Sequence, residues 1–176
     1  MGNPTLPPPR VSSRPVDAPY VFVSVADLRQ SKAPNAVIST LGLGSCLGVT
    51  CYDPFRKIGG MLHAMLPDSQ KHRPAKPNVP MYLDLGIPAL VEAVIALGGD
   101  ISNLEYKVFG GAQILQSNEY FSIGRQNVEM MKQLAARYRL NVVAWQVGGQ
   151  CNRSIDFHLR DGRVFLRMPA KSEAWV

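Results

Sequence analysis

The chain is poor in cysteine and has no long apolar run. Its 176 residues include only three cysteines, an odd number with no spacing typical of a disulfide framework. No apolar stretch approaches the length of a membrane span, and the opening MGNPTLPPPR lacks the apolar core of a signal peptide. We therefore expect a cytoplasmic protein with reduced thiols that is not embedded in a membrane.

Signatures of nucleic-acid binding are also missing. Lys and Arg total 19 against 13 acidic residues, a net charge of +6, which favours acidic partners. The charges are dispersed, however, and neither a basic helix nor an RNA-reading aromatic motif is present. We expect no nucleic-acid binding, and we interpret the basic QKHRPAKPN stretch as a solvated loop.

The length suits a single folded domain. Residues 1–17 contain five prolines and little to bury, which predicts a flexible N-terminal tail. We expect the folded domain over residues 18–170 and a C-terminal tail over 171–176. The proline-rich stretch 67–80 is expected to form a loop.

Strands outnumber helices in the expected pattern. Apolar residues at helical spacing over 87–95 predict an amphipathic helix, with Pro88 in its first turn and Gly98 at its end. A second helix is expected from a Ser122 cap to about Tyr138. The expected strands are rich in β-branched and aromatic residues and cover 20–25, 36–40, 45–52, 58–66, 105–112 and, as a buried strand, 141–147.

A hairpin completes this pattern near the C-terminus. Asp161-Gly162 lies between SIDFHL and RVFLRM and is a strong turn signal, with Ile155, Phe157 and Leu159 facing inward and His158 outward. Two helices among about eight strands predict an α/β (α+β) sandwich of mixed sheets.

The segment LGLGSCLGV (41–49) places Cys46 among three glycines. A dinucleotide-binding loop requires G-x-G-x-x-G before a helix, but here the spacing is one residue too long and a strand follows. The other interpretation is a nucleophile that needs a nearby base, since the thiolate is the reactive form of cysteine. His63 lies on the next expected strand, and antiparallel pairing would place the two segments side by side.

Strand alternation separates the thiols in this region. It places Cys46 with Gly48 on one face and Cys51 on the opposite, more apolar face, so Cys51 is interpreted as structural. The spacing alone leaves open that Cys46 is a small buried apolar residue and His63 a hydrogen-bonded core residue. The cysteines and histidines match no standard ligand spacing, so we expect no metal site.

Several motifs together resemble one known family. TLGLGSCLGV, GGMLHAMLP, KVFGGAQIL, IGRQNV, VGGQCNR and DGRVFLR occur in family order and cover roughly residues 20–168. The chain resembles the chemoreceptor glutamine deamidases (CheD). This resemblance implies a compact sandwich similar to the catalytic domains of deamidating bacterial toxins. It also implies a cysteine hydrolase without a cofactor that converts glutamine to glutamate on methyl-accepting chemotaxis receptors.

The resemblance also assigns residues to roles. By motif position, Cys46 is the nucleophile, His63 the general base and Thr40 the third catalytic residue. The implied reaction passes through a thioester, with donors near the glycine turn stabilising the oxyanion. The candidate substrate or oxyanion positions are Gly44, Ser45, Gly110 and Gly111, and the last two are interpreted in preference as tight turns between layers.

Other features of the resemblance leave alternatives open. The family also binds a CheC-type phosphatase, but Gln146 and Asn152 replace a common aspartate and glycine, a difference expected to affect that binding or the choice of receptor. Arg153 either anchors a loop or meets receptor carboxylates. The alternatives to deamidation are hydrolysis of receptor glutamyl methyl esters or another cysteine amidase reaction, and a largely non-catalytic role in regulating the phosphatase. We expect a monomer.

Overall fold

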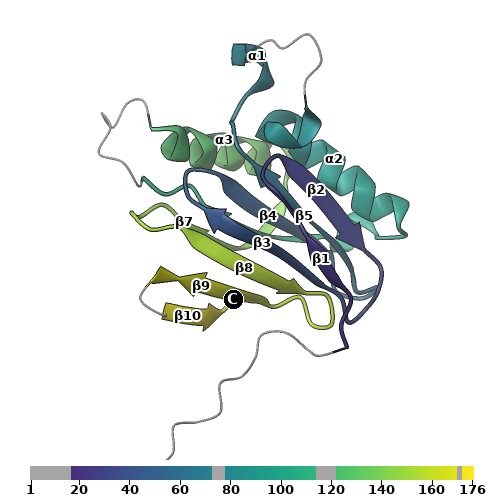
Figure 1. Cartoon of the computed structure of the whole chain (residues 1–176). Coiled ribbons are helices and arrows are strands. Elements are labelled where there is room, and N and C mark those ends of the chain that lie inside the picture. Colours follow the sequence, from purple (N-terminus) through teal and green to yellow (C-terminus); the bar gives the residue numbers. More distant parts are fainter. Residues whose placement is uncertain (1–16, 73–77, 114–121, 170–171) are drawn as a thin grey trace, which may run out of the picture.

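The computed structural model describes residues 17–72, 78–113, 122–169 and 172–176. These residues form three layers, in which helices α2 and α3 pack on one face of a sheet and a second sheet packs on its other face (Figure 1). The α+β sandwich with mixed sheets is therefore confirmed. The predicted N-terminal tail lies outside the described residues except for Asp17.

Ten strands of the described chain form two five-stranded sheets. Sheet A has the order β1 (Tyr20–Phe22), β3 (Val37–Leu43), β8 (Arg153–His158), β9 (Val164–Met168) and β10 (Ser172–Trp175). Sheet B has the order β2 (Asp27–Ser31), β5 (Ile58–Ala64), β4 (Leu47–Asp53), β6 (Glu105–Gly110) and β7 (Asn141–Val147). The pairs β1–β3 and β6–β7 are parallel, whereas the other strand pairs are antiparallel.

The helices are α1 (Ser69–His72), α2 (Leu83–Ala96) and α3 (Ile123–Tyr138), with short 3-10 turns η1 (Val79–Met81) and η2 (Ile101–Asn103). The predicted cap of α3 is confirmed, because the Ser122 side chain accepts a hydrogen bond from the Arg125 N–H. The prediction that Pro88 lies in the first turn of α2 is wrong, since the helix begins at Leu83. Packing extends it: Leu83 is fully buried, and Gly86 sits so close to Leu62 that a Cβ would lie 2.9 Å from that side chain.

Two apolar clusters hold the layers together. The first joins sheet B to α2 and α3, and it includes Leu47, Val49 and Cys51 of β4. The second fills the space between the sheets, and Cys46 packs against it. The predicted alternation along β4 is therefore confirmed, with Cys51 buried on the helix side.

The edges of the sheets differ from the expected pattern in one strand that is more exposed than predicted and two strands that were not predicted. Strand β7 is a half-exposed edge strand rather than a buried one, with Val143 48% and Trp145 37% exposed. Strand β2 was not expected. Four residues assigned to a C-terminal tail form β10, where the Trp175 ring lies 5.0 Å from the His158 ring. Both missed strands are short and pair at an edge, where backbone hydrogen bonds form without an apolar pattern.

The predicted loop 67–80 is also partly helical. It contains α1 and most of η1, while residues 73–77 lie outside the described part of the chain. None of the helices in the described ranges is both long and apolar enough to cross a bilayer.

Candidate active site

The three predicted catalytic residues come from both sheets: Thr40 contacts His63 across the sheets, and Cys46 directly precedes the strand that pairs with the strand of His63. Cys46 lies directly before β4, and His63 is on the antiparallel neighbour β5, opposite Gly48. Thr40 is on β3 of sheet A. The predicted antiparallel pairing of the segments that carry Cys46 and His63 is confirmed.

A hydrogen-bond chain connects Thr40 to the imidazole of His63. The Thr40 hydroxyl donates to the Val23 carbonyl oxygen at 2.7 Å, and its Oγ1 lies 2.8 Å from His63 Nδ1. A hydroxyl has one proton to donate. Because that proton is directed to Val23, Oγ1 must accept from Nδ1–H. The chain therefore fixes the tautomer of His63 with Nδ1 protonated and Nε2 free to accept a proton.

Burial keeps the imidazole neutral. His63 is 1% exposed, and its Nε2 is buried without a hydrogen-bond partner among the described residues. Burial lowers the pKa of His63 to about 4, because the charged form loses its hydration. At neutral pH, His63 is thus an uncharged base.

The Cys46 thiol is neutral for a related reason. It is half-buried, and burial raises the pKa of the Cys46 thiol above its usual value, although a hydrogen bond from its own backbone N–H acts in the opposite direction. A neutral thiol beside a neutral imidazole suits proton transfer during attack on a substrate, rather than a standing thiolate–imidazolium pair.

Three consecutive carbonyl groups of the glycine turn that carries Cys46 accept hydrogen bonds that hold the turn in place. The carbonyl oxygens of residues 44–46 accept hydrogen bonds from, in order, the Ala112 N–H (2.8 Å), the Asn127 Nδ2 amide (2.8 Å) and the Gly111 N–H (2.9 Å). All three donors come from the end of β6 or from α3. The carbonyl side of the turn is therefore fully engaged by the protein itself.

The Gly110–Gly111 pair supports this turn through close approach. Their φ angles are +106° and +64°, and a Cβ on Gly110 would lie 2.2 Å from the Cys46 carbonyl oxygen. Both positions therefore require glycine. Because the Gly111 N–H already donates to the Cys46 carbonyl oxygen, it is not available to an oxyanion, whereas the turn itself includes the buried Gly44 and the half-buried Ser45.

Asn127 is a site residue that was not predicted. It is fully buried on α3, and its Nδ2 also donates to the Met65 carbonyl oxygen at 3.0 Å. The available signal was an uncharged polar residue next to Val128, on the helix stripe that continues to Met131. Such a residue inside an apolar stripe indicates a hydrogen-bonding task.

The remaining polar candidates lie outside this constellation. Arg153 is 8% exposed, and its Nη1 donates to the Cys151 carbonyl oxygen at 3.3 Å, a contact in line with the loop-anchor interpretation. His158 packs against Trp175. Within the described ranges, no group of three or more His, Cys, Asp or Glu side chains could hold a metal ion.

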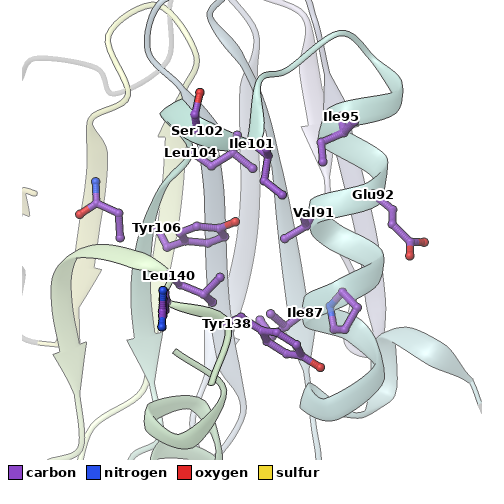
Figure 2. A pocket seen from close by; sticks show the side chains of 13 residues that line it. Ile87, Val91, Glu92, Ile95, Ile101, Ser102, Leu104, Tyr106, Tyr138 and Leu140 are labelled. Atoms are coloured by element: carbon purple, nitrogen blue, oxygen red, sulfur yellow. The ribbon is translucent and has the colours of Figure 1, made fainter. Parts of the chain in front are cut away.

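A pocket of about 590 Å³ lies at the far end of sheet B from Cys46. It opens between α2, η2, the start of β6 and the end of α3, and Val91 and Tyr106 point toward one another across it (Figure 2). Strand β6 runs from Tyr106 at this pocket to Gly110 beside the Cys46 turn. None of the predicted site residues lines the pocket.

The amino-acid sequence is similar to those of known proteins. The family profile of CheD, described as CheD chemotactic sensory transduction, matches residues 65–168. A relative from Desulforamulus reducens, named a "Probable chemoreceptor glutamine deamidase CheD", is 40% identical over 84% of this chain and 89% of its own length. Proteins of the same name from Pyrococcus horikoshii and Geobacillus kaustophilus are each 39% identical, over 84% and 88% of this chain and 91% and 95% of their own lengths. Identity and coverage at this level show that the chain belongs to the CheD family.

Proposed function

We propose that this protein is a chemoreceptor glutamine deamidase that uses Cys46 as nucleophile, His63 as general base and Thr40 to orient the imidazole. One observation supports this proposal above the others. The Val23–Thr40–His63 chain leaves an unprotonated Nε2 on the strand next to the thiol. A third group that orients the base is the recurring logic of catalytic triads.

The first half of the reaction forms a thioester. His63 Nε2 takes the thiol proton as Cys46 Sγ attacks the carboxamide carbon of the glutamine side chain, which requires Sγ within hydrogen-bond reach of Nε2. The carbonyl electrons move to oxygen, and the oxyanion accepts hydrogen bonds from N–H groups of the turn. The imidazolium then gives its proton to the leaving nitrogen, and ammonia departs as the C–N bond breaks.

The second half releases glutamate. His63 removes a proton from water as the water oxygen attacks the thioester carbon, and the imidazolium returns that proton to the departing sulfur. Throughout, Thr40 Oγ1 accepts from Nδ1–H in both the neutral and the charged imidazole. Since burial is the cause that keeps the pKa of His63 low, the imidazolium readily gives up its proton in each half.

The proposal includes partners that follow from the family. Its substrates are the cytoplasmic domains of methyl-accepting chemotaxis receptors, its second partner is a CheC-type phosphatase, and the protein acts as a cytoplasmic monomer. If Gln146 weakens phosphatase binding, Gln146→Asp should tighten the complex on a sizing column. Equal binding by both forms would remove that position from the interface.

Mass spectrometry of receptor fragments tests the deamidation. Fragments are incubated with the protein in water enriched in heavy oxygen, so that each glutamate formed by hydrolysis carries the label. The matched control is Cys151→Ala, because Cys151 is also half-buried. Labelling with the wild type and Cys151→Ala but not with Cys46→Ala supports the proposal.

The same incubation separates the alternatives. Absence of labelled glutamate on every receptor of the host, with Cys46 still reactive toward alkylating agents, would refute the deamidase proposal. Methylated fragments are then assayed for methanol release, which would identify the methylesterase reaction.

A further inference from the structure

A single buried side chain connects the two halves of the candidate site. Asn127 donates from Nδ2 to the carbonyl oxygen of Ser45, which precedes the nucleophile, and to that of Met65, two residues after His63. Its two bonds, at 2.8 Å and 3.0 Å, tie the Cys46 turn and the end of β5 to α3. No other described side chain donates to either carbonyl.

The orientation of this amide is determined by its partners. Both are carbonyl oxygens, which only accept hydrogen bonds, so the nitrogen and not the oxygen must face them. The opposite atom, Oδ1, is buried without a partner among the described residues. Burying an unpartnered amide oxygen in an apolar layer costs free energy. A residue retained for packing alone would be apolar, as Val128 and Met131 are on the same helix.

The Ser45 contact sets the direction of the Cys46 N–H. The Ser45–Cys46 peptide bond is trans, so its C=O and N–H point in opposite directions. With the C=O directed at α3, the N–H points away from the helix. This N–H also acts on the Cys46 sulfur, where its hydrogen bond lowers the thiol pKa. It donates to no backbone oxygen of another described residue.

The other two carbonyl groups of the turn accept hydrogen bonds from backbone donors, whereas the Ser45 carbonyl accepts from the side chain of Asn127. The carbonyl groups of residues 44 and 46 accept from the backbone N–H groups of Ala112 and Gly111. The Ser45 carbonyl instead accepts from a side chain. Of the three bonds that orient the turn, this one can be removed by a side-chain substitution that leaves the backbone of residues 111 and 112 unchanged.

We infer that Asn127 is a positioning residue that aims the Cys46 N–H at the developing oxyanion and fixes the spacing between the nucleophile turn and the His63 strand. This inference rests on the proposed function and adds a residue to it. Loss of one oxyanion donor reduces kcat by about 10²–10³-fold, and misplacement of a reacting group by about 1 Å costs roughly 10²-fold. Because Asn127 is buried behind the turn, KM should change little.

The experiment compares two substitutions at this position with a control on the same helix. Asn127→Asp keeps the shape but directs an oxygen at the carbonyl groups, and Asn127→Leu removes the amide while filling the space. The control is Met131→Ala, which is fully buried on α3 and has no hydrogen bond to the turn, so it lowers stability alone. All are made in the full chain carrying Cys151→Ala, where Cys46 is the thiol that is not fully buried.

Two readouts are measured. One is the kcat and KM of receptor deamidation, and the other is the rate of Cys46 alkylation by iodoacetamide against pH, which requires no receptor. We expect both Asn127 variants to lose about 10²-fold in kcat with KM within about threefold. Their alkylation curves should move to higher pH, because the sulfur loses the hydrogen bond from its own N–H. Met131→Ala should change neither.

The outcomes distinguish this inference from the proposed function. Wild-type kcat in both Asn127 variants, or losses equal to that of Met131→Ala at equal stability, would overturn the positioning role while deamidation stands. An alkylation shift confined to the Asn127 variants, with no deamidation by the wild type, would support the positioning role and refute the proposed reaction. A lower kcat without any alkylation shift would overturn the assignment of the Cys46 N–H.

Discussion

The effect of removing the Thr40 hydroxyl can be predicted from its two hydrogen-bond distances. Thr40→Val keeps the branched shape of a fully buried side chain but removes the atom that bonds Val23 and His63 at 2.7 Å and 2.8 Å. The Val23 carbonyl and the His63 Nδ1–H are then left without their partner. Each buried polar group left unsatisfied costs about 1–3 kcal/mol. Since no cavity forms, we expect the free energy of unfolding to fall by about 2–6 kcal/mol.

The same change should alter the chemistry of His63. Without Thr40 Oγ1 as acceptor, Nδ1 no longer has to carry the proton, and the tautomer protonated at Nε2 becomes populated. That tautomer cannot accept the Cys46 proton. We therefore expect deamidation to slow by about 10²-fold, which is the low end of the contribution of a general base.

Three measurements check this reasoning. Urea unfolding gives the stability change, nitrogen NMR of the imidazole gives the tautomer, and receptor labelling gives the rate. Thr40→Ser is the matched control, since it keeps the hydroxyl and loses one methyl group, worth about 1 kcal/mol. It should retain the Nδ1–H tautomer. A Thr40→Val protein with wild-type stability and tautomer would refute the hydrogen-bond argument.

Three further predictions follow from the same geometry. Because the pKa of His63 is about 4 in the fold, below its usual value of 6.5, the unfolded chain binds the proton first. The wild type should lose about 3 kcal/mol relative to His63→Gln as pH falls from 6.5 to 4, and a constant difference in urea unfolding would contradict this. Gly110→Ala should lower the free energy of unfolding by more than about 3 kcal/mol. Gly42→Ala should lower it by only about 1–2 kcal/mol, because a Cβ at this position, where φ is +69°, would lie in open space. Equal losses would refute the close-approach argument. In a Cys151→Ala background, Cys46 alkylation should rise only at a pH above that at which an ordinary thiol ionises, because burial raises the pKa of this thiol, and a plateau already present below pH 7 would instead indicate a standing ion pair.

Elements defined by local signals could be predicted from the sequence. The bounds of α3 follow from the Ser122 cap and the apolar stripe, which both lie within the helix itself. Helix α2 starts earlier than its stripe because Leu83 and Gly86 gain contacts with β5 that no local pattern records. Strands β2 and β10 pair through their backbones at sheet edges, so composition did not mark them.

In the candidate site, too, local sequence signals predicted some residues and missed others. Alternation and a short turn predicted that Cys46 and His63 lie on adjacent strands, because both are in consecutive segments of one sheet. Thr40 came only from the family resemblance, since its contact with His63 crosses from sheet A to sheet B. Asn127 was missed because its partners are carbonyl groups more than sixty positions away in sequence.

The proposed triad is divided between two sheets, so its geometry requires both sheets to be packed together. Sheet B alone brings Cys46 and His63 close, but the tautomer of His63 is set by Thr40 from sheet A, and the two sheets are held together by the second apolar cluster. A newly synthesised chain with sheet B formed and sheet A undocked therefore lacks an oriented base. Enzyme activity also reports on this packing of the sheets: loosening of the inter-sheet layer at Phe157, for example, should reduce turnover before the chain unfolds.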